Sequence, residues 1–355
     1  MSVASPLKLG VLGCANIAKQ FVRDVAGSSI VQIQTVASRD AAKAREFAEK
    51  FGLPEYFDSY EALLRDPQIE AVYVPLPNSL HAEWAIKAAE AGKHVLCEKP
   101  LALNREEAAA MFDAGRRNGV FLLEAYPFYF QPQIREMASL LNEGVIGEVR
   151  SVQASFGFTL LSPDGNIRMS PEMGGGALLD AGSYPVALIR LVMGEAPVKV
   201  MAKSSWVDSG VDISTVATLF YADGRRAQVS CAMNAANHRR ATIVGSQGVI
   251  ETEYLNHTAA QPGDNPYGYL PSQLRMRRGI AFNIPFEEIQ AATGSGFLFA
   301  AEAFAKLVRE NDTASFERAA QTSIDIAATL EAISRSAKSS SEDCVSIYPG
   351  SSNGK

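Results

Sequence analysis

Short apolar runs alternate with helix-spaced apolar residues through roughly the first 125 residues of the chain. The runs predict strands at Leu7–Leu12, Ile30–Ser38, Ala71–Leu76, His94–Cys97 and Val120–Glu124. The segments between them predict helices at Asn16–Val25, Ala41–Phe51, Ser79–Ala91 and Asn104–Asn118. Repeated strand–helix units with nearly continuous apolar strands are typical of a doubly wound parallel sheet covered on both faces. Such α/β sheets bind ligands beyond the carboxyl ends of their strands.

A different pattern begins after about Tyr126. Alternation with a period of two runs through Arg150–Phe158 and Ala227–Met233, which predicts a sheet built largely of antiparallel strands. Phe297–Arg309 and Glu317–Ser336 are expected to be closing helices. The chain should therefore divide into two domains, at 1–126 and 127–338, followed by a flexible Ser- and Gly-rich tail at 339–355.

Composition restricts what this chain can do. The 355 residues carry a formal net charge of −6, from 33 Lys and Arg against 39 Asp and Glu, without a basic block, so we expect no nucleic-acid partner. No apolar run approaches the roughly 20 residues that span a bilayer, and Met1–Gly10 contains no long apolar stretch. We therefore expect no membrane association and a cytoplasmic location. Four cysteines without CxxC spacing and four histidines without an HExxH motif predict no protein-built metal site.

The turn after the first strand has a form that suits a dinucleotide. Gly13 takes the first position of a GxGxxG fingerprint, whereas Ala15 and Ala18 replace the second and third glycines. A pyrophosphate needs close backbone approach and free amides at this point. The candidate cradle consists of Gly13, Cys14, Ala15, Asn16 and Ile17. The alternative is a tight strand–helix turn that binds nothing.

The end of the second strand indicates which dinucleotide is bound. An NAD site usually has Asp or Glu there, about 20 residues past the fingerprint, to hold the ribose 2′-hydroxyl. This chain has Ser38 and Arg39 at that point, with Lys43 one helical turn further on. A hydroxyl and two cations suit a 2′-phosphate, so the cofactor is expected to be NADP. The alternative is a surface Ser-Arg pair that begins a helix.

Two more strand ends carry polar residues. Glu98 and Lys99 follow one strand, while Leu76 ends another and is followed by Asn78 and His81. All five are candidates for the cofactor crevice, where the carboxyl ends of neighbouring parallel strands meet. Taken singly, Lys99 is more often a solvated charge, and Asn78 a helix cap with His81 packed on the first turn.

A glycine run in the second half precedes two residues suited to proton transfer. Asp180 and Tyr184 stand four residues apart, so on a helix they share one face. Reduction of a carbonyl needs a nearby proton donor, and a tyrosine serves if a cation such as Lys99 stabilises its phenolate. The alternative is that Asp180 bonds locally and Tyr184 fills the core.

Together these segments resemble the Gfo/Idh/MocA family of oxidoreductases, named for glucose–fructose oxidoreductase and inositol dehydrogenase. The resemblance extends from about Leu7 to about Ser336 and includes the glycine turn, PNxxH, Glu-Lys-Pro and GGGALLDAGSY. It implies an N-terminal Rossmann domain and a C-terminal α/β domain with a large open sheet that often forms oligomer contacts. It also implies that Lys99 is the catalytic-site lysine, that Asp180 orients the substrate and that Tyr184 is the acid/base.

Tyr184 is similar to the sugar-handling branch of that family, where many other members have His. That branch resembles glucose–fructose oxidoreductase, NADP-dependent xylose dehydrogenase, dimeric dihydrodiol dehydrogenase and nucleotide-sugar 3-ketoreductases, and VASRD at 36–40 resembles its NADP users. Relatives of xylose dehydrogenase carry EAxMYRxHP, whereas Tyr129 and Gln131 stand here in place of its Arg and His. Arg168, in the loop before the glycine run, resembles a loop that reaches the nicotinamide or substrate.

The expected function is an NADP(H)-dependent oxidoreductase that acts on a sugar or another polyhydroxylated small molecule. The alternatives are trans-dihydrodiol dehydrogenase activity, an aldose–aldose oxidoreductase that retains its NADP, and a non-catalytic NADP-binding regulator. A homodimer or homotetramer is also expected. The strand that carries Phe156 and Phe158 has an uncharged opposite face, whereas a solvent-facing sheet normally carries more charge.

Overall fold

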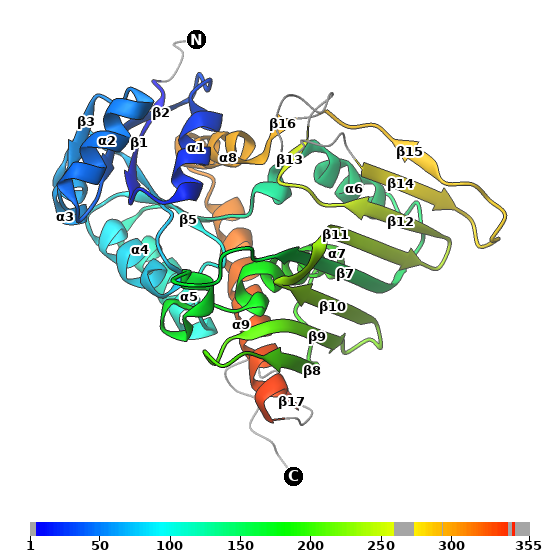
Figure 1. Cartoon of the computed structure of the whole chain (residues 1–355). Coiled ribbons are helices and arrows are strands. Elements are labelled where there is room, and N and C mark those ends of the chain that lie inside the picture. Colours follow the sequence, from blue (N-terminus) through cyan, green and yellow to red (C-terminus); the bar gives the residue numbers. More distant parts are fainter. Residues whose placement is uncertain (1–4, 259–272, 293, 340–342, 345–355) are drawn as a thin grey trace.

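The computed structural model describes residues 5–258, 273–292, 294–339 and 343–344 (Figure 1). Its N-terminal half is a six-stranded parallel sheet in the order β3-β2-β1-β4-β5-β6. The strands are β1 (Leu7–Leu12), β2 (Val31–Ala37), β3 (Glu55–Phe57), β4 (Ala71–Val74), β5 (His94–Glu98) and β6 (Leu122–Ala125). The helices are α1 (Asn16–Val25), α2 (Ala41–Phe51), α3 (Tyr60–Arg65), α4 (His81–Glu90) and α5 (Arg105–Asn118). The doubly wound parallel sheet predicted from the sequence is therefore confirmed.

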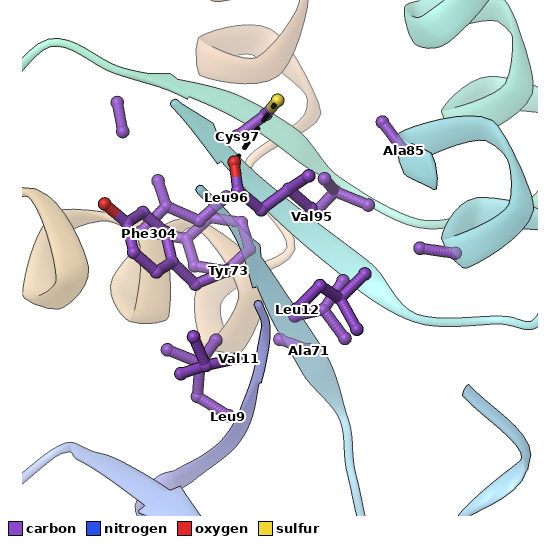
Figure 2. Packing of buried hydrophobic residues seen from close by; sticks show 14 of the residues in the cluster. Leu9, Val11, Leu12, Ala71, Tyr73, Ala85, Val95, Leu96, Cys97 and Phe304 are labelled. Atoms are coloured by element: carbon purple, nitrogen blue, oxygen red, sulfur yellow. Dashed lines mark hydrogen bonds between the residues drawn. The ribbon is translucent and has the colours of Figure 1, made fainter. Parts of the chain in front are cut away.

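The strands β1, β4 and β5 of this sheet are buried on both faces, as their apolar runs predict. Figure 2 shows side chains of β1, β4 and β5 packed together with Phe304 from near the C-terminal end of the chain. Phe21 of α1 stacks on Tyr73 of β4 with 3.8 Å between ring centroids. The sequence analysis missed β3 and α3, which are only three and six residues long.

The C-terminal half contains a nine-stranded sheet in the order β15-β14-β12-β11-β7-β10-β9-β8-β17. Its strands are β7 (Val149–Thr159), β8 (Lys199–Trp206), β9 (Asp212–Phe220), β10 (Arg226–Ala232), β11 (Asn234–Gly245), β12 (Gly248–Glu253), β14 (Gln273–Arg278), β15 (Glu287–Ile289) and β17 (Asp343–Cys344). Strands β7 and β10 pair in parallel and the other neighbours are antiparallel, so the mostly antiparallel sheet is confirmed. A short separate pair joins β13 (His257–Thr258) to β16 (Gly294–Ser295).

Helices cover one face of this large sheet: α6 (Pro132–Asn142) packs against β14, α7 (Ser183–Met193) against β7 and β10, and α9 (Thr313–Ser339) against β8. The helix α8 (Gly296–Glu310) packs instead against α1 and the parallel sheet. Short 3-10 turns lie at Asn78–Leu80, Pro127–Phe130, Ile167–Met169 and Pro171–Met173, and a π-helical turn lies at Leu178–Gly182. In Figure 1, α6 and α7 lie behind the sheet. The strand β7 turns Val152, Ala154 and Phe156 toward the buried side, while Gln153 stays exposed on the other.

The closing helices connect the two halves of the molecule. Phe297 and Phe304 of α8 and Phe316 of α9 belong to the core of the parallel sheet, whereas Ile326 and Ile333 of α9 belong to the core of the large sheet. The helix expected at Glu317–Ser336 is longer at both ends in the structure. It begins earlier because the carboxylate of Asp312 accepts the amide of Ser315 and caps the first turn.

Two residues of the expected tail form a short strand. Asp343 and Cys344 pair with Val200 and Lys199 at an edge of the large sheet. Most of the remaining tail lies outside the described residues.

Within the described residues, one segment has the length and apolar composition of a membrane span, at Pro171–Met193. Most of it is buried inside the protein, and a 3-10 turn, a π-helical turn and α7 divide it. Packing of α7 against β7 and β10 accounts for its apolar composition.

Candidate active site

A cleft of about 710 Å³ lies at the carboxyl ends of β1, β4 and β5 and is closed on its far side by the large sheet and α7. Ten of the residues selected from the sequence line it: Ala15, Asn16, Ile17, Leu76, Asn78, Glu98, Lys99, Arg168, Asp180 and Tyr184. These motifs are separated by up to about 170 residues along the chain. The fold therefore brings them together at the edge where doubly wound sheets bind ligands.

The glycine turn leaves the start of α1 open toward this cleft. Gly13 has φ +107°, and a Cβ at this position would lie 3.1 Å from Cδ2 of Leu76. Ala15 precedes α1 and offers no side chain to its first amides, and the first turn contains no acidic residue. The carboxylate of Asp40, in contrast, caps α2. An uncapped helix start beside a cleft suits a phosphate group, so these residues fit a dinucleotide.

Cys14 lies behind this turn rather than on the wall of the cleft. Its Sγ is 3.7 Å from the backbone oxygen of Lys43, and burial raises the pKa of its thiol. The side chain therefore packs the turn against α2 in the neutral form.

The end of β2 presents a cation beside the glycine turn. Arg39 is exposed, and its positive charge acts on the hydroxyl of Tyr60, whose oxygen lies 3.6 Å from where a Cβ of Gly13 would be. Ser38 accepts a hydrogen bond from the amide of Asp40 at 3.2 Å. The Asp40 carboxylate accepts the amides of α2 and lies 3.8 Å from Nζ of Lys43. Within the described ranges, Arg39 has no carboxylate partner.

The structure places His81 behind the cleft wall. It is completely buried, and its ring nitrogens lie 2.9 Å from the oxygen of Pro100 and 2.8 Å from that of Leu76. Burial lowers the pKa of His81, against the carbonyl contacts that raise it. The residue therefore ties together the loops after β4 and β5, and of the segment that ends at His81, Leu76, Pro77 and Asn78 reach the cleft.

The three glycines before Asp180 permit close backbone packing. Gly174 has φ +73°, and its carbonyl accepts a hydrogen bond from Nδ2 of Asn78 at 2.8 Å. A Cβ on Gly175 would collide with the backbone of Arg168, and one on Gly176 would collide with the carboxylate of Asp212. Larger residues at these positions would move the start of the helical segment that carries Asp180 and Tyr184.

Asp180 occupies a π-helical turn and Tyr184 the first turn of α7, so both side chains reach the cleft. Asp180 forms two ion pairs, at 3.2 Å to Nζ of Lys99 and at 2.6 Å to Nε of Arg168. Burial raises the pKa of Asp180, but the positive charges of Lys99 and Arg168 outweigh burial and lower this pKa to about 2. The carboxylate is therefore ionised at neutral pH.

Lys99 is held as a cation next to the ring of Tyr184. Its Nζ donates to the backbone oxygen of Asp180 at 2.9 Å and lies 4.6 Å from the centroid of the Tyr184 ring. Burial lowers the pKa of Lys99, but Tyr184, Asp180 and Glu98 together raise it above its ordinary value. Glu98 accepts a hydrogen bond from the Tyr73 hydroxyl at 2.6 Å, and burial raises its pKa.

The sequence analysis missed two polar residues beside Tyr184. Nδ2 of Asn256 donates to the Tyr184 hydroxyl oxygen at 3.0 Å, and the guanidinium carbon of Arg239 lies 4.8 Å from the centroid of its ring. Because an amide nitrogen only donates, Tyr184 accepts here and its own O–H hydrogen remains available to a molecule in the cleft. Asn237 and Phe158 also line this wall.

Tyr129 and Gln131, which replace the Arg and His of the EAxMYRxHP motif, bind backbone oxygens of neighbouring segments in this chain. The Tyr129 hydroxyl donates to the oxygen of Ala187 at 2.6 Å, and Nε2 of Gln131 donates to the backbone oxygen of Asn256 at 2.6 Å. Neither residue lines the cleft. Gln131 therefore holds the segment that places Asn256 against Tyr184.

A parallel sheet of the dinucleotide-binding kind with a Lys–Asp–Tyr cluster at its edge is typical of an oxidoreductase. Comparison with protein families identifies the same class. A profile described as "Oxidoreductase family, NAD-binding Rossmann fold" matches residues 7–126, and the GFO/IDH/MocA C-terminal domain matches residues 134–251. The chain belongs to the Gfo/Idh/MocA family of oxidoreductases.

Individual relatives cover nearly the whole chain. D-xylose 1-dehydrogenase (NADP(+)) 2 of Haloferax volcanii is 34% identical over 94% of this chain and 98% of its own. A 3-ketoreductase from Actinomadura kijaniata, crystallised with NADP and TDP-benzene, is 32% identical with a TM-score of 0.80 over 93% of this chain and 98% of that one. The aldose–aldose oxidoreductase from Caulobacter crescentus, complexed with glycerol, is 26% identical with a TM-score of 0.83 over 96% and 99%.

Proposed function

We propose that this protein is an NADP(H)-dependent oxidoreductase that interconverts an alcohol and a carbonyl group on a sugar. The observation that carries the proposal is the meeting of Lys99, Asp180 and Tyr184 in one cleft with the open start of α1. The names of the relatives in Haloferax volcanii, Actinomadura kijaniata and Caulobacter crescentus support both the cofactor and the kind of substrate. In this proposal residues 1–126 bind the cofactor and residues 127–338 provide the substrate wall and the oligomer surface.

The chain has the groups that an NADP molecule requires. Backbone amides at Ala15, Asn16 and Ile17 would hold the pyrophosphate, and Arg39 with Ser38 would hold the 2′-phosphate. Lys43 is the weaker candidate, because Asp40 already lies beside its ammonium group. The bound cofactor supplies the hydride chemistry, which no side chain of the protein can supply.

The remaining chemistry is a proton transfer by the protein. Tyr184 would donate a proton to the developing alkoxide during reduction, or accept one during oxidation. The Lys99 cation stabilises both the phenolate and the alkoxide, and Asp180 holds that cation in place. Asn256 directs the Tyr184 hydroxyl hydrogen away from itself and toward the cleft.

We further place the enzyme in the cytoplasm. Cys14, Cys97 and Cys231 are free thiols, which fits a reducing compartment.

Cofactor titration followed by a panel of aldoses and cyclic diols tests the proposed function. We expect tight binding of NADP and reversible oxidation of at least one aldose with release of NADPH. Turnover of diols alone would identify a dihydrodiol dehydrogenase instead. Exchange between two aldoses without NADPH release would identify an aldose–aldose oxidoreductase. NADP binding without turnover of any polyol would indicate a regulator and contradict the proposal.

Replacing Arg39 by Ala is expected to weaken NADP binding about 10- to 150-fold and to leave NAD binding nearly unchanged. The reason is the loss of a charge-assisted bond to the 2′-phosphate, worth about 1.5–3 kcal/mol. Fluorescence titration with NADPH and NADH measures both affinities. Arg45→Ala, on the exposed face of α2, is the matched control and should change neither. Equal losses for both cofactors would show that Arg39 does not read the phosphate.

We also expect a homodimer or homotetramer formed through the uncovered face of the large sheet. On this face Val216 is 54% exposed and Met201 is 42% exposed, among the polar side chains of Gln153, Gln228 and Ser230, and the face also carries Lys203 and Arg240. Exposed apolar residues gathered on a mostly polar face mark a contact surface.

Light scattering at micromolar concentration should give the mass of two or four chains. Val216→Arg should shift this mass toward the monomer, whereas Val198→Arg should not, because Val198 is similarly exposed but lies before β8. A monomeric wild-type protein would refute the prediction.

A further inference from the structure

Arg239 presents a fixed guanidinium group on the substrate side of the cleft. It lies on β11 directly opposite Phe156 of β7, and its guanidinium carbon is 4.0 Å from the centroid of the Phe156 ring and 4.8 Å from that of Tyr184. These aromatic contacts come from β7 and α7 of the C-terminal half, whereas the cofactor cradle comes from β1 and β2. The group therefore adjoins the proposed proton donor and not the phosphate-binding turn.

Throughout the described part of the chain, Arg239 has no carboxylate partner. The other arginine in the cleft, Arg168, is paired with Asp180, and the neighbouring Arg240 is 3.2 Å from Glu253. Three cations and two carboxylates line the cleft: Lys99, Arg168, Arg239, Glu98 and Asp180. The single carboxylate of Asp180 serves two of these cations, so the positive charge of Arg239 is left uncompensated.

The excess of positive charge is confined to the cleft, because the whole chain has a formal net charge of −6. A cationic cleft in an acidic protein attracts anions to that cleft in particular. A guanidinium that stacks its face on aromatic rings keeps its N–H donors at the edge, where they match the two oxygens of a carboxylate or phosphate.

Asn256 provides the complementary acceptor. Its Nδ2 is bonded to Tyr184, whereas its Oδ1 is buried and has no hydrogen-bond partner among the described residues. A buried acceptor of this kind needs a donor, and a sugar hydroxyl is one. Next to Tyr184 the wall thus offers a site for a hydroxyl and a site for an anion.

We propose that Arg239 determines substrate specificity by binding an anionic group, so that the natural substrate is a sugar that carries a carboxylate or a phosphate. The inference rests on the proposed sugar oxidoreductase function and names the substrate class of the same site. Binding of the anion by Arg239 also brings the sugar hydroxyls to Asn256 and Tyr184.

Matched neutral and anionic sugars test this inference. D-Glucose is compared with D-glucuronate, D-glucose 6-phosphate and dTDP-glucose. These three sugars carry a carboxylate, a phosphate monoester and a nucleoside diphosphate, respectively. Both kcat/KM and calorimetric binding to the NADP-loaded enzyme are measured for wild type and Arg239→Gln. Arg150→Gln is the control, because Arg150 is a largely exposed arginine near the start of β7 whose partner is Glu148.

We expect wild type to favour one anionic sugar at least tenfold over glucose. Arg239→Gln should lower kcat/KM for that sugar about 30-fold or more, mainly through KM, and lower the value for glucose by a clearly smaller factor. Arg150→Gln should alter neither.

An equal loss on neutral and anionic sugars would overturn the inference and show that Arg239 acts only through Tyr184. A wild-type preference for glucose would overturn it as well. Binding decides the matter even without turnover: failure of every sugar to react contradicts the proposed function, whereas equal affinities for glucose and the anionic sugars contradict the role of Arg239.

Discussion

Tyr184→Phe is expected to lower kcat by about 10²- to 10⁴-fold, the usual contribution of a positioned proton donor. The substitution removes one hydroxyl group and keeps the ring that packs against Phe156, Phe128 and Tyr126. The fold and the affinity for NADP should therefore be preserved. The lost bond from Asn256 contributes only about 1 kcal/mol to stability.

Steady-state kinetics with the best sugar of the panel measures this loss, and thermal unfolding with NADPH titration provides the controls. Tyr129→Phe is the matched variant, since it removes a hydroxyl that donates to Ala187 outside the cleft. Its kcat should stay within a few fold of wild type. A similar loss in both variants would mean that disturbed packing, and not a missing proton donor, causes the defect.

Lys99→Ala is expected to lower kcat by at least about 10²-fold. It removes the cation that would stabilise the phenolate and the alkoxide, and this side chain is only 12% exposed to solvent. It also leaves Asp180 with Arg168 as its one remaining ion-pair partner among the described residues. Because the raised pKa keeps Lys99 protonated in the wild type, the loss should be nearly constant between about pH 6 and pH 9.

Lys87→Ala is the control for this substitution, because Lys87 is a partly exposed lysine on α4, outside the cleft, that is paired with Glu83. Its kcat should equal that of wild type. A Lys99→Ala enzyme with near-normal kcat at all pH values would show that the cation is dispensable.

The sequence predicted those features of the fold that depend on local periodicity. The runs at β1, β4 and β5 and the helical spacing of α1 and α2 need only nearest-neighbour patterns, and their bounds agree with the structure within two residues. The convergence of Glu98, Lys99 and Asn78 followed because parallel strands end at one edge. The three-residue strand β3 is too short to show a period.

The features that sequence reasoning missed depend on contacts between distant segments. Arg239 reaches Tyr184 because β11 pairs with β7 and sets it opposite Phe156, and alternation within one strand does not reveal its neighbour. Asn256 lies in a loop held by Gln131, 125 residues away. His81 looked like a ligand-binding residue by type, but its burial between two backbone carbonyls decides its role.

The direct test of the central claim, that Tyr184 transfers the proton with assistance from Lys99, is a single-turnover cycle. Rate constants at saturating NADPH and substrate are measured for wild type, Tyr184→Phe, Lys99→Ala and the double variant. We expect each single variant to be slowed at least about 100-fold and the double variant to be slowed far less than the product of the two, because both residues act on one proton transfer. A Tyr184→Phe rate within threefold of wild type, about 0.65 kcal/mol of barrier, would contradict the account and leave Lys99 as the proton donor.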